Sequence, residues 1–194
     1  MKKTKIIGVS GAAGSFSEEA ALHYCHDEEI KDFNIKYLIS VERVLKNIEQ
    51  GKIDLGIFPI ENSNGGIVYE SVYAMAKYLF NIKKLFEIDI HHNLLTKPGI
   101  KGKDIKRIAS HDQALKQCKM YLRRKWPHAE IIEWADTAKA ARDLKENKLP
   151  KDCAVIAPKK SAEIYGLDIL EEAIQDLKFN FTTFLAIKNG VKNK

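Results

Sequence analysis

The sequence predicts an α/β protein built of two lobes. Short apolar segments typical of strands alternate with amphipathic helical segments along the 194 residues. Alternation at this spacing is typical of α/β folds with mostly parallel sheets. Two strand-like segments depart from the pattern, one near the middle of the chain and one at its end, and we predict that these two cross between the lobes.

The expected elements follow one another without a repeat or a Pro/Ser-rich linker. The expected strands are short apolar runs at residues 5–10, 34–39, 54–60, 86–95, 105–110, 129–134, 153–158 and 180–187. The expected helices are amphipathic stretches at residues 17–25, 41–50, 68–80, 113–125, 137–147 and 159–165.

One expected strand lies near the middle of the sequence and divides it. In this strand Phe86, Ile88 and Ile90 alternate with polar residues, which leaves one face of the strand polar. We expect one lobe from residues 1–85 plus 178–194 and the other from residues 93–172. The predicted architecture has mixed, mostly parallel sheets joined by two crossing strands. A ligand is expected in the cleft between the lobes, where strand C-termini and helix N-termini converge.

The composition is that of an ordinary globular protein, with 45% apolar and 30% charged residues. No apolar run approaches the roughly 20 residues that span a bilayer, and the basic start "MKKTKIIGVSG" is interpreted as a first strand of a cytoplasmic protein. The net charge of +6 comes from scattered lysines, which favours a small anionic substrate over nucleic acid. Three cysteines far apart show neither metal nor disulfide spacing.

Two loops after apolar strands carry candidate binding residues. In "SGAAGSFSEEAA", Ser15 and Glu18 form a capping box, and the glycines let the loop approach a ligand. That loop lacks the dinucleotide and P-loop signatures, so an ordinary βα turn is an equal reading. In "FPIENSNGGIVYES", the consecutive polar residues Glu61, Asn62 and Ser63 exceed what a plain turn needs.

A third loop, "ASHDQALKQC", opens with a second capping box between Ser110 and Gln113. Gln113 and Gln117 share a helix face, and His111 lies in the first helical turn. A capping serine and a surface histidine remain the plain alternative. Three helix N-termini that follow strand ends suit a small anion such as a carboxylate, which fits an enzyme and a ligand-binding protein equally well.

The stretch "FNFTTF" near the C-terminus places Asn180, Thr182 and Thr183 among three phenylalanines. Threonine is common in strands because its β-branch suits a pleated sheet. These residues alone therefore leave packing and chemistry both open.

Together the segments resemble the catalytic domain of the prephenate dehydratase family. "GAAGSFSEEAA" is similar to that family's G-P-x-G-T-F-S opening, and "PIENSNGG" to its P-I-E-N-S-x-x-G segment. "FEIDIHHNLL" and "SHDQALKQC" resemble its E-x-x-x-x-I-x-H and S-H-x-Q-A-L-x-Q-C segments, and "DTAKAA", "YGLDIL" and "IQDLKFNFTTF" complete the order. The match covers nearly all of the chain.

The resemblance implies roles for the C-terminal residues. The family carries N-x-T-R-F here, so Thr182 corresponds to the catalytic threonine, with Asn180 and Phe184 as its asparagine and closing aromatic. Thr183 stands where the family has an arginine that contacts the substrate carboxylate. The other implied substrate-binding residues are the loop residues Ser15, Glu61, Asn62, Ser63, Ser110, His111, Gln113 and Gln117.

The function implied by the resemblance is a lyase that converts prephenate to phenylpyruvate in L-phenylalanine biosynthesis. Its substrate would be a prephenate-like dicarboxylate, and the reaction would need no cofactor or metal. We also expect the protein to form a homodimer, to bind neither nucleic acid nor membrane, and to have no ACT regulatory domain. The threonine in place of arginine leaves alternatives open. These are an arogenate dehydratase, a prephenate decarboxylase-like enzyme, or a non-catalytic aromatic-acid-binding protein, since the two-lobed fold also resembles periplasmic binding proteins.

Overall fold

The computed structural model describes residues 4–190, which form two compact units. Unit 1 contains the described residues up to Ala12, Phe16–Asp89, and the described residues from Phe181 onward. Unit 2 contains Ile90–Asn180 and the short loop Ala13–Ser15. In the described part of the chain, no helix is both long and apolar enough to cross a membrane.

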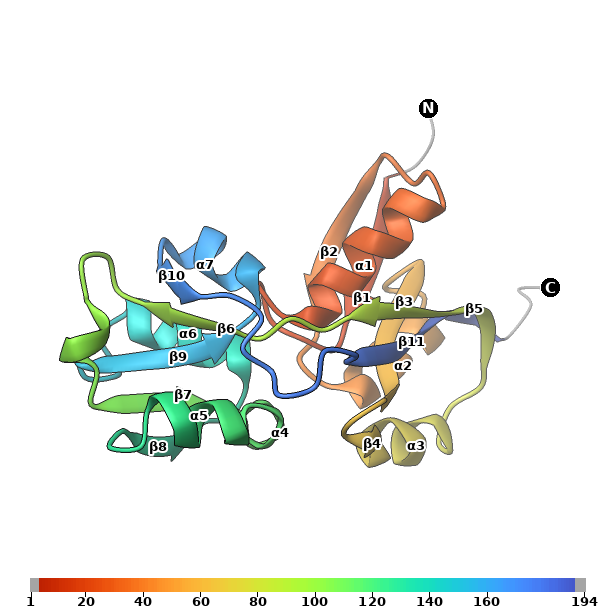
Figure 1. The fold of residues 1–194 in the computed structure, drawn as a ribbon. Helices are drawn as coiled ribbons and strands as arrows, with labels where there is room; N and C mark the ends of the chain where they lie inside the picture. Colours follow the sequence, from red (N-terminus) through yellow and green to blue (C-terminus); the bar gives the residue numbers. More distant parts are fainter. Residues whose placement is uncertain (1–3, 191–194) are drawn as a thin grey trace. The chain divides into compact units, whose positions relative to one another are not determined.

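Unit 1 is built on a mixed sheet with the strand order β2-β1-β3-β11-β5, and β4 pairs with β3 (Figure 1). β1 pairs in parallel with β2 and β3, while β11 runs antiparallel to both β3 and β5. The strands are β1 (Lys5–Val9), β2 (Phe33–Tyr37), β3 (Leu55–Asn62), β4 (Gly66–Ile67), β5 (Phe80–Asp89) and β11 (Phe181–Asn189). The helices are α1 (Phe16–Asp27), α2 (Val41–Glu49) and α3 (Tyr69–Met75).

Helices cover both faces of the unit 1 sheet. Successive residues of a strand point to opposite faces. Phe184 stacks on Phe86, which contacts Tyr24 of α1, whereas the next residue, Leu185, belongs to the apolar cluster of α2 and α3. β11 is therefore buried on both faces over this stretch, and its position is fixed from two sides.

Unit 2 has a second mixed sheet with the order β10-β6-β9-β7-β8 (Figure 1). Its strands are β6 (Asn93–Thr96), β7 (Arg107–Ser110), β8 (Glu130–Glu133), β9 (Cys153–Ala157) and β10 (Asp168–Glu171). Its helices are the 3₁₀ turn η1 (Gly102–Asp104), α4 (Asp112–Gln117), α5 (Lys119–Lys125), α6 (Thr137–Lys145) and α7 (Lys159–Tyr165). β9 lies at the centre and is buried along its whole length.

The expected alternation of elements is confirmed, with differences at the predicted crossings. The expected strand 86–95 is two strands, β5 in the unit 1 sheet and β6 in the unit 2 sheet, because the unit boundary falls after Asp89. β5 begins earlier, at Phe80, and α3 is correspondingly shorter. More of the strand pairs are antiparallel than the alternation of strands and helices predicted. The strands in such pairs include β5, β6, β10 and β11.

The expected helix 113–125 is also two helices, interrupted at Cys118. The side chain of Asp176 accepts the backbone N–H groups of Met120 and Tyr121 at 2.7 and 2.8 Å. In return, the backbone N–H of Asp176 donates to the carbonyl of Gln117 at 2.8 Å. A carboxylate at the start of α5 is favourable because the unpaired N–H groups there carry partial positive charge. A distant loop therefore ends α4 at Gln117.

Gly14 packs closely against α7, a contact that the sequence did not predict. The hydroxyl of Ser161 in α7 donates to the Gly14 carbonyl at 2.9 Å. Gly14 has a φ of +82°, and a Cβ there would lie 2.7 Å from the same hydroxyl. The structure therefore requires glycine for close packing on α7, whereas the sequence suggested approach to a ligand.

A buried carboxylate organises the end of α6. Asp143 is fully buried and accepts a hydrogen bond from Trp134 Nε1 at 3.0 Å and another from Lys139. Lys148 Nζ lies 3.5 Å from its other oxygen. Burial alone would raise the pKa of the Asp143 carboxyl, but these donors and charges outweigh it and hold the pKa below its ordinary value.

Replacing Asp143 with alanine is expected to lower the free energy of unfolding by about 2–4 kcal/mol at pH 7, because the Trp134 N–H and the lysines lose their acceptor. Asp143→Asn is the matched control, since it keeps an acceptor without charge. A carboxyl with a depressed folded-state pKa contributes stability above its unfolded pKa and loses it as pH falls through the folded pKa. Urea unfolding should therefore show the gap between wild type and Asp143→Asn closing below about pH 4. A gap that does not change with pH would contradict this account.

Candidate functional site

The pairing of β11 with β3 brings together polar residues far apart in the sequence. Thr182 lies opposite Asn62, and Thr183 lies opposite Glu61. The Asn62 side chain donates through Nδ2 to the Thr182 hydroxyl at 2.8 Å and to the Phe181 carbonyl at 3.1 Å. Its oxygen accepts the backbone N–H groups of the turn that follows, at 3.0 and 2.7 Å. The orientation of this amide is therefore fixed by backbone groups.

This orientation determines how the Thr182 hydroxyl is used. A hydroxyl has one hydrogen to donate and two lone pairs that accept. Because Asn62 Nδ2 is a donor, Thr182 Oγ1 accepts at that contact, and its own hydrogen points elsewhere. Among residues 4–190, no acceptor takes that hydrogen. Thr182 is 8% exposed, so the structure presents a nearly buried hydroxyl poised to donate.

The turn after β3 is tied to the same strand. Ser63 Oγ accepts the backbone N–H of Phe181 at 3.0 Å, and the backbone N–H of Ser63 donates to the Phe181 carbonyl at 2.8 Å. Gly66 pairs with Asn62 in the β3–β4 hairpin, and α3 follows directly after it. Ser63 therefore holds the start of β11 in place next to Thr182.

Thr183 lies between two acidic residues. Directly opposite residues of antiparallel strands share a face of the sheet, and Thr183 is opposite Glu61 on β3 and Glu87 on β5. Its hydroxyl donates to Glu87 Oε1 at 3.1 Å. Phe184, expected to contact substrate, is 1% exposed and stacks on Phe86 with ring centroids 6.0 Å apart, so the structure places it in the core.

A second polar cluster lies in unit 2. Gln117 Oε1 is 2.9 Å from Asn180 Nδ2 and 2.8 Å from His92 Nε2. Asn180 is fully buried and His92 is 4% exposed. The pKa of His92 is lowered to about 4, mainly because the ring is buried, and the hydrogen bond to Gln117 opposes this shift in part. His92 is therefore neutral at physiological pH.

The strand–helix junction at Ser110 differs from the prediction. Ser110 is fully buried and its hydroxyl donates to the Ile156 carbonyl at 2.6 Å. The N-cap of α4 is His111, whose Nδ1 accepts the backbone N–H of Gln113 at 3.3 Å. The capping box predicted for Ser110 and Gln113 is therefore wrong, because the inward side chain of the last strand residue pairs with a neighbouring strand. Gln113 is exposed.

Ser15 immediately precedes α1, the position where the sequence expected a cap. Glu18, its expected capping partner, accepts a hydrogen bond from the Tyr37 hydroxyl at 2.6 Å. Ser15 belongs to unit 2 and α1 to unit 1, so this loop changes unit within three residues.

His92 is the polar residue of this cluster that sequence reasoning left out of the site. The only available signal was its place in "FEIDIHHNLL", directly after the polar-faced strand. Its contact with Gln117 joins residues 25 positions apart, which no local pattern reveals.

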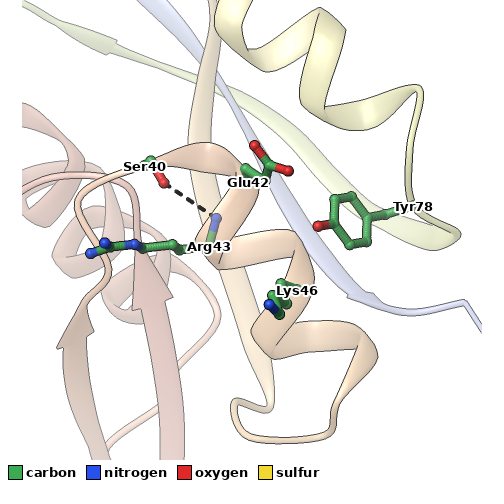
Figure 2. A pocket seen from close by; sticks show the side chains of 5 residues that line it. All are labelled: Ser40, Glu42, Arg43, Lys46 and Tyr78. Atoms are coloured by element: carbon green, nitrogen blue, oxygen red, sulfur yellow. Dashed lines mark hydrogen bonds between the residues drawn. The ribbon is translucent and has the colours of Figure 1, made fainter.

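A surface pocket of about 260 Å³ lies elsewhere, at the start of α2 (Figure 2). Its lining side chains are mostly exposed and charged, and Ser40 there accepts the backbone N–H of Arg43. None of the predicted site residues lines it; the lining residues are Ser40, Glu42, Arg43, Lys46 and Tyr78. Within residues 4–190, no cluster of three or more His, Cys, Asp or Glu side chains is placed to hold a metal ion.

Comparison with known proteins is consistent across sequence and structure. The family model described as prephenate dehydratase matches residues 7–192. The chain is 37% identical to prephenate dehydratase of Methanocaldococcus jannaschii, over 93% of this chain and 64% of that protein. It is 34% identical to arogenate dehydratase 5 of Arabidopsis thaliana, over 93% of this chain and 41% of that protein. The chain thus spans less than two thirds of either relative.

Solved structures agree on the fold. Prephenate dehydratase from Arthrobacter aurescens, in complex with L-Phe, superposes with a TM-score of 0.87 at 27% identity, covering 96% of this chain and 60% of that one. A periplasmic substrate-binding protein of an ABC transporter from Coxiella burnetii gives a TM-score of 0.52 at 15% identity, covering 98% and 87%, and shows likeness of fold alone. The predicted two-lobed α/β fold is confirmed.

The family match covers nearly the whole chain, and the segments that carry it contain the Thr182–Asn62 pair of unit 1 and the Gln117–Asn180 pair of unit 2. This chain belongs to the prephenate dehydratase family.

Proposed function

We propose that the protein catalyses the decarboxylating dehydration of prephenate to phenylpyruvate, with Thr182 as the group that assists departure of the hydroxyl. The observation that carries the proposal is the hydrogen bond from Asn62 Nδ2 to Thr182 Oγ1, which leaves the hydroxyl hydrogen to a ligand. Family membership supplies the substrate class. The lyase activity, the cytoplasmic location and the homodimer stay predictions of this proposal.

The reaction needs little from the protein besides binding and one donor. The bond between the ring and its carboxylate breaks and releases carbon dioxide, and its electron pair completes the aromatic ring. The C4–O bond breaks at the same time, and the departing oxygen takes up one proton to leave as water. A hydroxyl donor at that oxygen stabilises the charge that develops there and typically contributes about 10²–10⁴ in rate. Solvent then restores the proton balance.

The contacts separate donors from supporting residues. The Asn62 amide is engaged by Thr182, Phe181 and the following turn, so we assign it to positioning Thr182. Ser110, bonded to a buried carbonyl, supports the end of β7. His111 and Gln113 are exposed at the start of α4. Asn180 donates through Nδ2 to the Ile90 carbonyl and to Gln117 Oε1, so we assign it to holding Gln117 in place.

Arogenate is the second candidate substrate. Relatives named for prephenate and for arogenate match at similar identity, 37% and 34%. The two acids differ in a side chain that carries a keto or an amino group. Incubation with each acid, with products separated by mass spectrometry, distinguishes phenylpyruvate from phenylalanine. Binding without turnover of either acid would instead support a ligand-binding protein.

Replacing Thr182 with valine is expected to lower kcat for prephenate by about 10²–10⁴, because the shape stays and the donor is lost. Thr182→Ser keeps the hydroxyl and should retain most of the rate. Thr183→Val is the matched control for removing a threonine hydroxyl from β11, because the Thr183 hydroxyl already donates to Glu87. Phenylpyruvate absorbance in alkali reports the product. Undiminished turnover by Thr182→Val would reject the mechanism.

Asn62→Asp tests the direction of the hydrogen bond. The carboxylate still accepts the N–H groups of the turn, but it has no N–H to donate to Thr182. It accepts the hydroxyl hydrogen of Thr182 instead. We expect kcat to fall nearly as far as in Thr182→Val, although the threonine is intact. Circular dichroism checks the fold. If Asn62→Asp stays as active as wild type, the amide does not control the hydroxyl.

Restoring arginine at Thr183 places a guanidinium beside Glu61 and Glu87. Five N–H donors exceed what two monodentate carboxylate contacts take, so donors are left for a substrate carboxylate. A charge-assisted hydrogen bond of about 1.5–3 kcal/mol predicts a KM for prephenate that is lower by about 10-fold or more. Thr183→Gln supplies similar length without charge and should change KM little. Equal KM values for the two variants would mean that charge at this position does not anchor the substrate.

A further inference from the structure

The pocket at the start of α2 is a cavity of unit 1 that the proposed reaction does not use (Figure 2). The apolar residues of α2 recur at the spacing of one helix face, and this face is buried. The N-cap Ser40, Arg43 and Lys46 are each three residues apart, so they are neighbours along the exposed surface of the helix. Tyr78 reaches the pocket from the segment after α3, with its ring pointing towards α2. Two separate segments of the chain therefore form one cavity.

The carboxylates and the capped backbone groups around this pocket already have protein partners. Glu42 accepts a hydrogen bond from Lys77 Nζ at 3.3 Å. Glu70 Oε1 of α3 accepts the first backbone N–H of α2 at 3.3 Å, and the Ser40 hydroxyl oxygen accepts the backbone N–H of Arg43 at 3.3 Å. The binding capacity that is left in the pocket therefore lies in side chains other than the carboxylates.

The remaining polar side chains of the lining can all act as donors. Within residues 4–190, no protein group pairs with the Arg43 guanidinium, the Lys46 ammonium or the Tyr78 hydroxyl. The Ser40 oxygen already accepts a backbone N–H, so its own hydrogen is left to donate. Glu42 is paired with Lys77 and does not neutralise the two cations. Two uncompensated positive charges beside two hydroxyl donors favour an anion with several acceptor oxygens.

We propose that this pocket is a second ligand site, which binds the phosphate group of a small phosphorylated molecule. A phosphate monoester carries a charge of about −1.5 to −2 at neutral pH and three acceptor oxygens, whereas a carboxylate carries a single charge and two oxygens. Arginine forms paired hydrogen bonds to phosphate, and lysine contributes a point charge. The cavity of about 260 Å³ is smaller than the roughly 300–1,000 Å³ of pockets for drug-sized ligands, so the molecule it holds is small.

This site is separate from the candidate catalytic residues, none of which lines the pocket. α2 packs through its buried face against Leu185 and Ile187 of β11, whereas Arg43 and Lys46 are exposed. The proposed reaction has no step in the pocket. A protein without prephenate turnover would therefore contradict the proposed function and leave the phosphate site standing.

Titration of the ¹⁵N-labelled protein with inorganic phosphate and with glycerol phosphate tests the site directly. We expect saturable shifts of the backbone amides at residues 40–47 and 76–79, with a Kd of about 1 mM or lower at low salt. A lower Kd for glycerol phosphate would assign contacts to its organic part, and equal values would assign binding to the phosphate group alone; both support the proposal. Shifts confined to other segments, or equally tight binding of the dicarboxylate malonate, would overturn it.

Variants of the lining separate local contacts from net charge. Arg43→Gln and Lys46→Gln each remove one charge-assisted hydrogen bond, so the Kd for phosphate should rise by about 10-fold in each. Tyr78→Phe keeps the ring and removes the hydroxyl, and we expect a smaller rise of about 3-fold. Lys83→Gln removes the same charge from an exposed position of β5 outside the pocket and is the matched control. A Kd that rises as much in Lys83→Gln as in Arg43→Gln would mean that only the general positive charge attracts phosphate, and it would overturn the site.

Discussion

The position of β11 between β3 and β5 is the constraint on which unit 1 depends. Antiparallel pairing on both sides fixes the register of this strand, and the helices on both faces of the sheet hold it in place. The register then places Thr182 opposite Asn62, 120 residues away in the chain. A shift by one residue would turn the Thr182 hydroxyl to the other face of the sheet.

Backbone groups decide what the amide side chains of both units can do chemically. An amide offers an acceptor at one end and donors at the other, and rotation by half a turn exchanges them. In unit 1, the turn after β3 and the Phe181 carbonyl fix the Asn62 amide, which makes it a donor to Thr182. In unit 2, the Ile90 carbonyl fixes Asn180, and through it Gln117 and His92. The direction of each hydrogen bond follows from main-chain atoms.

Position 183 shows how a family difference acts through its neighbours. The strand register places Thr183 beside Glu61 and Glu87, and its hydroxyl donates to Glu87. Arginine there would be flanked by two carboxylates, which would hold its planar group in place. Threonine leaves both glutamates without that partner and changes the local charge. The difference therefore concerns the charge around the candidate site as well as a single ligand contact.

The sequence by itself determined the α/β alternation, most element positions and the family, because apolar periodicity and ordered motifs are local properties. It also singled out Thr182, Asn62, Gln117 and Asn180. Only the tertiary structure decided that Ser110 and Phe184 are buried, that Gly14 packs on α7, and that His92 joins Gln117. It also decided where α4 ends, because the carboxylate of Asp176 comes from a segment more than fifty residues away. Contacts between distant segments depend on strand register and helix packing, which no local pattern encodes.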